Sequence, residues 1–116
     1  GELSTSERAL VALASEEPML EQVLRWSAVN SGSDNLPGLE TMASLLADAF
    51  SALPGELRLV DPAPVTRVDP SGRTEEVAHG RHLHLTVRPG APVQLLLTGH
   101  MDTVYPTSHP FQQTRL

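Results

Sequence analysis

Residues 95–106 read LLLTGHMDTVYP, an apolar run that ends in a glycine and is followed by His100 and Asp102. The wider segment 93–99, VQLLLTG, is apolar on both sides after Gln94, which is typical of a strand covered on both faces. Open α/β sheets bind their ligands at the carboxyl ends of such strands. The stretch therefore predicts a buried strand with two polar residues at its ligand-binding end.

His100 and Asp102 are two positions apart, so in an extended backbone their side chains point to the same side. A metal-binding imidazole usually donates its other N–H to a carboxylate or carbonyl, which fixes the tautomer. The pair is thus a candidate metal ligand with its orienting partner. A simpler interpretation is a hydrogen bond at a strand end. Gly99, just before the pair, would let the backbone turn or approach a neighbour closely.

The first half of the chain predicts two or three helices. The helical segments are residues 5–30, broken near Ser15 with a second helix from about Glu17, and residues 36–53. The break is expected because Pro18 interrupts the first segment. Residues 30–38 have the composition of a loop, and the Pro–Gly pair at 54–55 ends the last helix.

The second half predicts three strands, at residues 56–60, 81–89 and 93–99. The middle strand alternates strictly, with leucines on one face and His82 and His84 on the other. These two histidines could chelate a metal, but the polar face of a half-buried strand is the simpler interpretation. Residues 61–80 are expected to be a loop or hairpin. The fold class is therefore α/β, with part of a larger mixed sheet.

Composition narrows the classes of partner and ligand. The 116 residues are 40% hydrophobic and 19% charged, as in globular domains, and no long apolar segment predicts a membrane span. A net charge of −6 argues against nucleic acid as the main partner. Because the chain has no cysteine, a metal here must be bound by His, Asp or Glu. His79 and His109 are expected to be solvated.

The segment GHMDTVYP resembles the first metal motif of the di-zinc peptidase and deacylase family. That family includes glutamate carboxypeptidase, acetylornithine deacetylase, succinyl-diaminopimelate desuccinylase and aminoacylase. Its pattern is an apolar strand followed by Gly-His-x-Asp-x-Val-x-Pro, which is matched in order and spacing by Gly99, His100, Asp102, Val104 and Pro106. Residues 29–50 also resemble the family's N-terminal region, and HMDTVYP is most similar to the glutamate carboxypeptidase branch.

The resemblance implies a zinc-exopeptidase-like three-layer fold and a hydrolase that cleaves an amide bond of a small peptide or N-acyl amino acid. In such enzymes two zinc ions, replaceable by cobalt or manganese, share a bridging aspartate and a water, and a glutamate is the general base. By resemblance, His100 is a ligand of one zinc. Asp102 is the catalytic residue that orients His100 and does not itself bind metal.

The other ligands, the general base and the dimerisation domain all lie downstream of this motif in the family. Only His100 and Asp102 carry over, whereas a catalytic zinc needs about three protein ligands. We therefore expect residues 1–116 to be the N-terminal portion of a catalytic domain, inactive alone and part of a cytoplasmic homodimer at full length. The alternative is a non-catalytic interaction or structural module that retains the His-x-Asp motif for folding.

Overall fold

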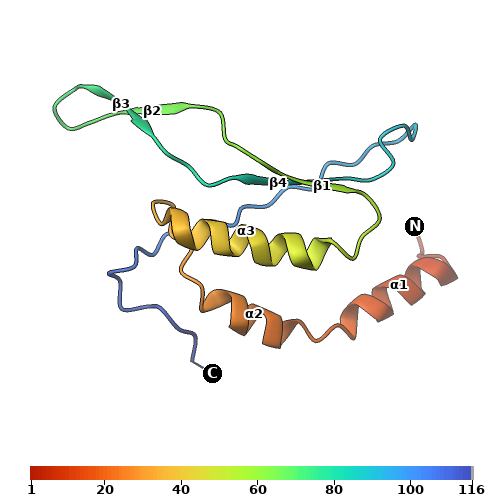
Figure 1. The fold of residues 1–116 in the computed structure, drawn as a ribbon. Helices are drawn as coiled ribbons and strands as arrows, with labels where there is room; N and C mark the ends of the chain where they lie inside the picture. Colours follow the sequence, from red (N-terminus) through yellow and green to blue (C-terminus); the bar gives the residue numbers. More distant parts are fainter. Residues whose placement is uncertain (116) are drawn as a thin grey trace.

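The structure is a computed structural model that describes residues 1–115. Within them, three helices precede four strands, which form two small antiparallel sheets (Figure 1). The elements are α1 (Thr5–Ser15), α2 (Met19–Ser27), α3 (Leu36–Phe50), β1 (Glu56–Val60), β2 (Val65–Val68), β3 (Thr74–Val77) and β4 (His82–Thr86). The predicted α/β class and the order of helices before strands are confirmed.

Local signals place the helix boundaries. Ser4 and Glu7 form a capping box at α1, in which the Ser4 Oγ accepts from the Glu7 N–H at 3.2 Å. Hydrogen bonds from Ser4 lower the pKa of Glu7. The predicted break is confirmed, but α2 begins at Met19 rather than near residue 17. The reason is Pro18, whose ψ of 63° is not helical and which acts as the N-cap.

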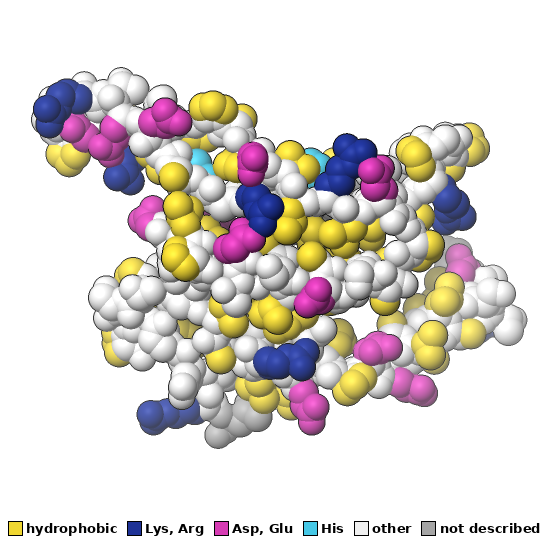
Figure 2. Space-filling view, in the orientation of Figure 1, with side chains coloured by type: hydrophobic (Ala, Val, Ile, Leu, Met, Phe, Trp, Pro, Cys, Tyr) yellow, Lys and Arg dark blue, Asp and Glu magenta, His cyan; other side chains and the backbone are white. Residues whose placement is uncertain are grey.

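The β1–β4 sheet packs along α3 (Figure 1). Its register places Leu57 opposite Leu85 and Leu59 opposite Leu83, so four half-buried leucines share one face. The predicted alternation along residues 81–89 is confirmed. From α3 come the buried hydrophobic residues of the described chain, Leu39, Met42 and Ala43. Figure 2 shows apolar side chains gathered between this sheet and the helix.

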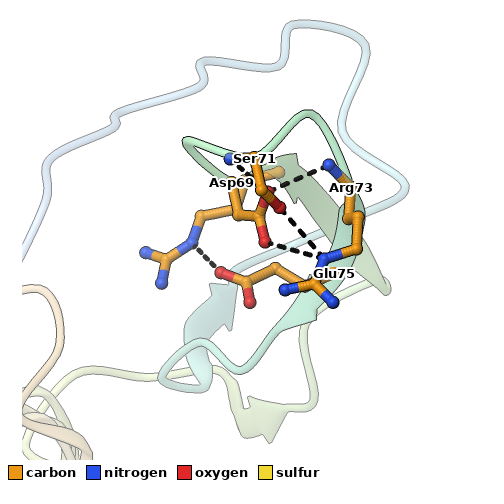
Figure 3. A network of polar contacts seen from close by, with 5 residues as sticks. Asp69, Ser71, Arg73 and Glu75 are labelled. Carbon is orange, nitrogen blue, oxygen red and sulfur yellow. Dashed lines mark hydrogen bonds and ion pairs between the residues drawn. The ribbon is translucent and has the colours of Figure 1, made fainter.

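β2 and β3 form a hairpin that extends away from the rest of the molecule, as expected for a hairpin in residues 61–80 (Figure 1). At its turn the Asp69 carboxylate accepts from the Ser71 N–H at 2.8 Å and the Arg73 N–H at 2.9 Å (Figure 3). The Ser71 hydroxyl also donates to this carboxylate, at 2.6 Å, and is the main cause of the lowered pKa of Asp69, to which the Arg73 N–H adds. Gly72 has the positive φ of 83° that the turn requires. Across the strands, Arg67 pairs with Glu75 at 2.6 Å.

The predicted buried strand over residues 93–99 is wrong, and so is the predicted mixed sheet. The segment has no regular secondary structure, and its apolar side chains are exposed: Val93 by 75%, Leu95 by 86%, Leu96 by 88% and Leu97 by 91%. The physical reason is the lack of a partner. In the described part of the chain, no backbone hydrogen bond reaches these residues from another strand.

The described chain is much more open than a compact domain of its size. Its accessible surface is 9679 Å², against about 6,200 Å² expected for a compact 12.5 kDa monomer. Its radius of gyration is 18.4 Å, against about 13 Å expected. No helix among the described residues is long and apolar enough to cross a membrane.

Truncating Leu39 to alanine should lower the free energy of unfolding by about 2–5 kcal/mol, because the side chain is only 5% exposed at the centre of this small core. Urea unfolding followed by circular dichroism measures the change. Leu10→Ala is the matched control. That side chain is 65% exposed, so its loss should change the free energy of unfolding by about 0.5 kcal/mol or less. Equal effects of both substitutions would contradict a core centred on α3.

Glu40 on α3 pairs with Arg81, which donates from Nε at 3.2 Å, and this hydrogen bond lowers the pKa of Glu40. A lowered pKa in the folded state stabilises the protein above the unfolded pKa, and this contribution is lost as the pH falls through the folded pKa. Glu40→Gln should therefore lower the urea midpoint relative to the parent chain at pH 7, with a smaller difference in acid. Glu76→Gln, on exposed β3, should show no such pH dependence.

Candidate metal centre

The loop between α2 and α3 lies against the segment that carries the His-x-Asp motif. The Thr103 N–H donates to the Ser31 carbonyl at 2.8 Å, and the Ser33 N–H donates to the Thr103 carbonyl at 3.1 Å. These two bonds form an isolated parallel bridge between Gly32 and Thr103. Ser31 is 1% exposed, so the contact is closed to water at its centre. The motif is thereby fixed to residues that are far away in the sequence.

Asn30 holds the same two segments together through its side chain. Its Nδ2 donates to the Tyr105 carbonyl at 3.0 Å and to the Gln112 side chain at 2.9 Å. Its Oδ1 accepts from the Gly32 N–H at 3.0 Å and from the Asn35 amide at 3.1 Å. The composition of residues 30–38 predicts only a loop. Asn, Ser and Asp side chains in a loop are expected to form hydrogen bonds with backbone groups, but the sequence does not tell which residues carry those backbone groups.

Gly32 is the position where the two segments approach most closely. A Cβ there would lie 2.7 Å from the Tyr105 carbonyl oxygen, which is closer than real Cβ atoms come. Of the two roles expected for Gly99, a turn or a close approach, the close approach is wrong, because a Cβ at Gly99 would meet nothing within 4 Å. The glycine that the site requires therefore lies in the loop and not in the motif.

The structure brings the two predicted site residues together. The Nδ1 of His100 lies 3.0 Å from the Asp102 Oδ1 and 2.9 Å from the Asp102 backbone oxygen. A carboxylate and a carbonyl only accept, so Nδ1 must carry the proton and donate. The lone pair of the neutral ring is then on Nε2, on a side chain that is 84% exposed. This is the nitrogen that a metal would bind. The roles of ligand and orienting residue stay predictions.

Ser33 is a member of the site that the sequence pattern does not indicate. Its hydroxyl donates to the Asp102 Oδ2 at 2.6 Å, and this bond is the main cause of the lowered pKa of Asp102. Partial burial opposes the shift, and the bond from His100 adds to it. Asp102 is therefore ionised over a wider acidic range than an ordinary aspartate. A charged Asp102 is what a donating His100 Nδ1 needs.

This Ser–Asp–His chain is not a nucleophile triad. A nucleophilic serine passes its proton to the imidazole, whereas Ser33 donates to the carboxylate. The site fits a metal only in part, with one imidazole and its orienting carboxylate. Among residues 1–115 there is no group of three or more His, Asp or Glu residues that could hold an ion. A catalytic zinc needs about three protein ligands, and the described residues do not supply them.

The other histidines contribute no ligand set. The rings of His82 and His84 lie with centroids 6.3 Å apart on the exposed face of β4, as the polar-face interpretation predicts. His79 is exposed. His109 is half-buried and packs on Tyr105 with ring centroids 4.7 Å apart, so the expectation that it is solvated is wrong. Its contact with Tyr105 extends the aromatic packing to Phe111, 5.0 Å from the Tyr105 ring.

No family model matches the sequence, and comparison with curated proteins and with solved structures gives no significant match. The likeness to the di-zinc family therefore rests on the motif residues and stays a prediction.

Gly32→Ala should push the Tyr105 carbonyl away and open the contact between the loop and the motif. We expect faster hydrogen exchange at the Thr103 and Ser33 amides, which bond across this contact, measured by two-dimensional NMR. Gly90→Ala is the matched control, because a Cβ at Gly90 would meet nothing within 4 Å. Unchanged exchange in the Gly32 variant would show that the two segments are not in contact in solution.

Proposed function

We propose that this chain is the N-terminal part of the catalytic domain of a zinc-dependent hydrolase with the three-layer fold of the di-zinc peptidase and deacylase family. Its substrate would be a small peptide or an N-acyl amino acid, cleaved at the amide bond. One observation carries the proposal: within the segment that matches the family's motif, His100 donates from Nδ1 to Asp102 and leaves Nε2 open. That arrangement is the usual one for a metal-binding histidine.

In this proposal His100 would be a ligand of one of two zinc ions, and cobalt or manganese could replace zinc. The chemistry that such a metal would supply is a water of lowered pKa and polarisation of the substrate carbonyl. Asp102 keeps the proton on Nδ1, aims the ring and makes Nε2 a better electron donor. The bridging aspartate, the general-base glutamate and the dimerisation domain would come from other parts of a cytoplasmic homodimer.

The second candidate function is a non-catalytic interaction or structural module. It is favoured by the exposed surface of 9679 Å², well above that of a compact monomer, and by the exposed leucines at 95–97. Within this alternative the His100–Asp102 pair would only stabilise the motif segment. The two candidates differ in whether a metal at His100 matters for any activity.

Hydrolysis of a panel of N-acyl amino acids and dipeptides by the natural protein that carries this sequence tests the proposal. We expect zinc-dependent turnover that a chelator removes and zinc restores. Asp102→Asn should lower kcat/KM about 10- to 100-fold, the usual effect of losing a residue that orients a metal ligand. His100→Ala should lower it further, because it removes the ligand itself.

The matched control is His84→Ala, an exposed histidine on β4 outside the site, which should leave kcat/KM unchanged. Turnover that survives His100→Ala, or no turnover of any panel member by zinc-loaded protein, would favour the interaction module.

A further inference from the structure

We propose that Ser33 is a positioning residue that selects which nitrogen of His100 is free to bind a ligand. Its hydroxyl holds the Asp102 carboxylate in the orientation that keeps the proton on His100 Nδ1. The consequence for catalysis depends on the proposed function. The hydrogen-bond chain from Ser33 to His100 does not, and it can be tested without a metal.

The Asp102 carboxylate is held from two sides. Its Oδ2 accepts from the Ser33 hydroxyl at 2.6 Å, and its Oδ1 accepts from His100 Nδ1 at 3.0 Å. Rotation of the carboxylate about its Cβ–Cγ bond would break both bonds together. Each oxygen has its own donor, so Ser33 restrains the oxygen that faces the imidazole without competing for it. The Ser33 hydroxyl is thus coupled to the His100 ring through the rigid carboxylate of Asp102.

The backbone fixes the donor and the acceptor relative to one another. Ser33 donates its N–H to the Thr103 carbonyl at 3.1 Å, and Thr103 directly follows Asp102. The Ser33 hydroxyl has one alternative acceptor, the Thr103 carbonyl oxygen at 3.4 Å. The bond to Asp102 is shorter and has a charged acceptor, so it is the stronger of the two. Ser33 is therefore preorganised to hold this carboxylate.

Asp102 also accepts from Nδ1 with its backbone oxygen, at 2.9 Å. The Nδ1–H tautomer of His100 is accordingly stabilised by two acceptors, the carboxylate and the backbone oxygen of Asp102. Ser33 positions only the carboxylate. Removing the hydroxyl should weaken the preference for this tautomer without abolishing it. A hydrogen bond of ordinary net strength corresponds to about a fivefold change in the ratio of the tautomers.

His109 provides an internal reference with the opposite tautomer. Its Nδ1 accepts from the Phe111 N–H at 3.0 Å, so its proton must be on Nε2 when the ring is neutral. The chain should thus contain one Nδ1–H histidine at position 100 and one Nε2–H histidine at position 109. Both can be read in one spectrum.

The experiment is long-range ¹H–¹⁵N correlation NMR of the full chain with ¹⁵N-labelled histidine, at a pH high enough that the rings are neutral. In the parent chain we expect the Nδ1–H form for His100 and the Nε2–H form for His109. Ser33→Ala should lower the ratio of Nδ1–H to Nε2–H at His100 about fivefold and leave His109 unchanged. Ser33→Thr, which keeps the hydroxyl, should restore the parent ratio.

Ser15→Ala is the control, since that hydroxyl bonds only within α1, to the Val11 carbonyl. If Ser33→Ala does not fold, the pair Ser33→Thr and Ser33→Val isolates the hydroxyl, because threonine and valine have nearly the same shape. An unchanged His100 ratio in folded Ser33→Ala, or equal ratios in the Thr and Val variants, would overturn the proposal.

Zinc titration of the natural protein that carries this sequence, with and without Ser33→Ala, separates this inference from the proposed function, because residues 1–115 alone contain no complete ligand set. Under both proposals zinc perturbs the His100 Nε2 resonance, and Ser33→Ala weakens that binding about tenfold. If zinc leaves Nε2 of the parent chain unperturbed while the tautomer ratio still depends on Ser33, the metal proposal fails and the role of Ser33 stands. If zinc binds but the tautomer ratio does not depend on Ser33, the role of Ser33 fails and the metal proposal stands.

Discussion

The backbone contact between residues 31–33 and Thr103 is the interaction on which the candidate site depends. Two hydrogen bonds, at 2.8 and 3.1 Å, join a loop that leads into α3 to the segment just after His100 and Asp102. Because a parallel bridge needs close backbones, the contact requires Gly32, where a Cβ would lie 2.7 Å from the Tyr105 oxygen. Without this contact, nothing in the described chain would hold the Ser33 and Asp102 side chains close to one another.

The site combines polar bonds with the edge of the core. The buried hydrophobic residues of the described chain all lie on α3, and one of them, Met42, lines a cleft together with Met101 and Tyr105 of the motif segment. Asn30 bonds to four groups on both sides of the contact. Each such bond contributes only about 1 kcal/mol net, so the position of the motif depends on several of them acting together.

Elements that depend on local pattern could be predicted from the sequence, and elements that depend on distant partners could not. The alternation in β4 and the spacing of α3 report which face is apolar, and both match the structure. The run 93–99 has the pattern of a covered strand, but a strand also needs neighbours, and none pairs with it among the described residues. His100 and Asp102 can be predicted because they are only two positions apart in the sequence. Ser33 cannot, because its bond to Asp102 joins residues 69 positions apart.

An exposed histidine beside an aspartate would ordinarily be a weak pair that samples many rotamers. Here the aspartate is held by Ser33, the Nδ1 proton has a second acceptor in the Asp102 backbone, and the loop is fixed by Asn30. The entropy of ordering the imidazole is therefore lost when the chain folds and not when a ligand arrives. The His100 imidazole is thus oriented before any ligand binds, with Nδ1 hydrogen-bonded and Nε2 open to solvent. This arrangement suits the proposed role as a metal ligand better than a role in stabilising the fold.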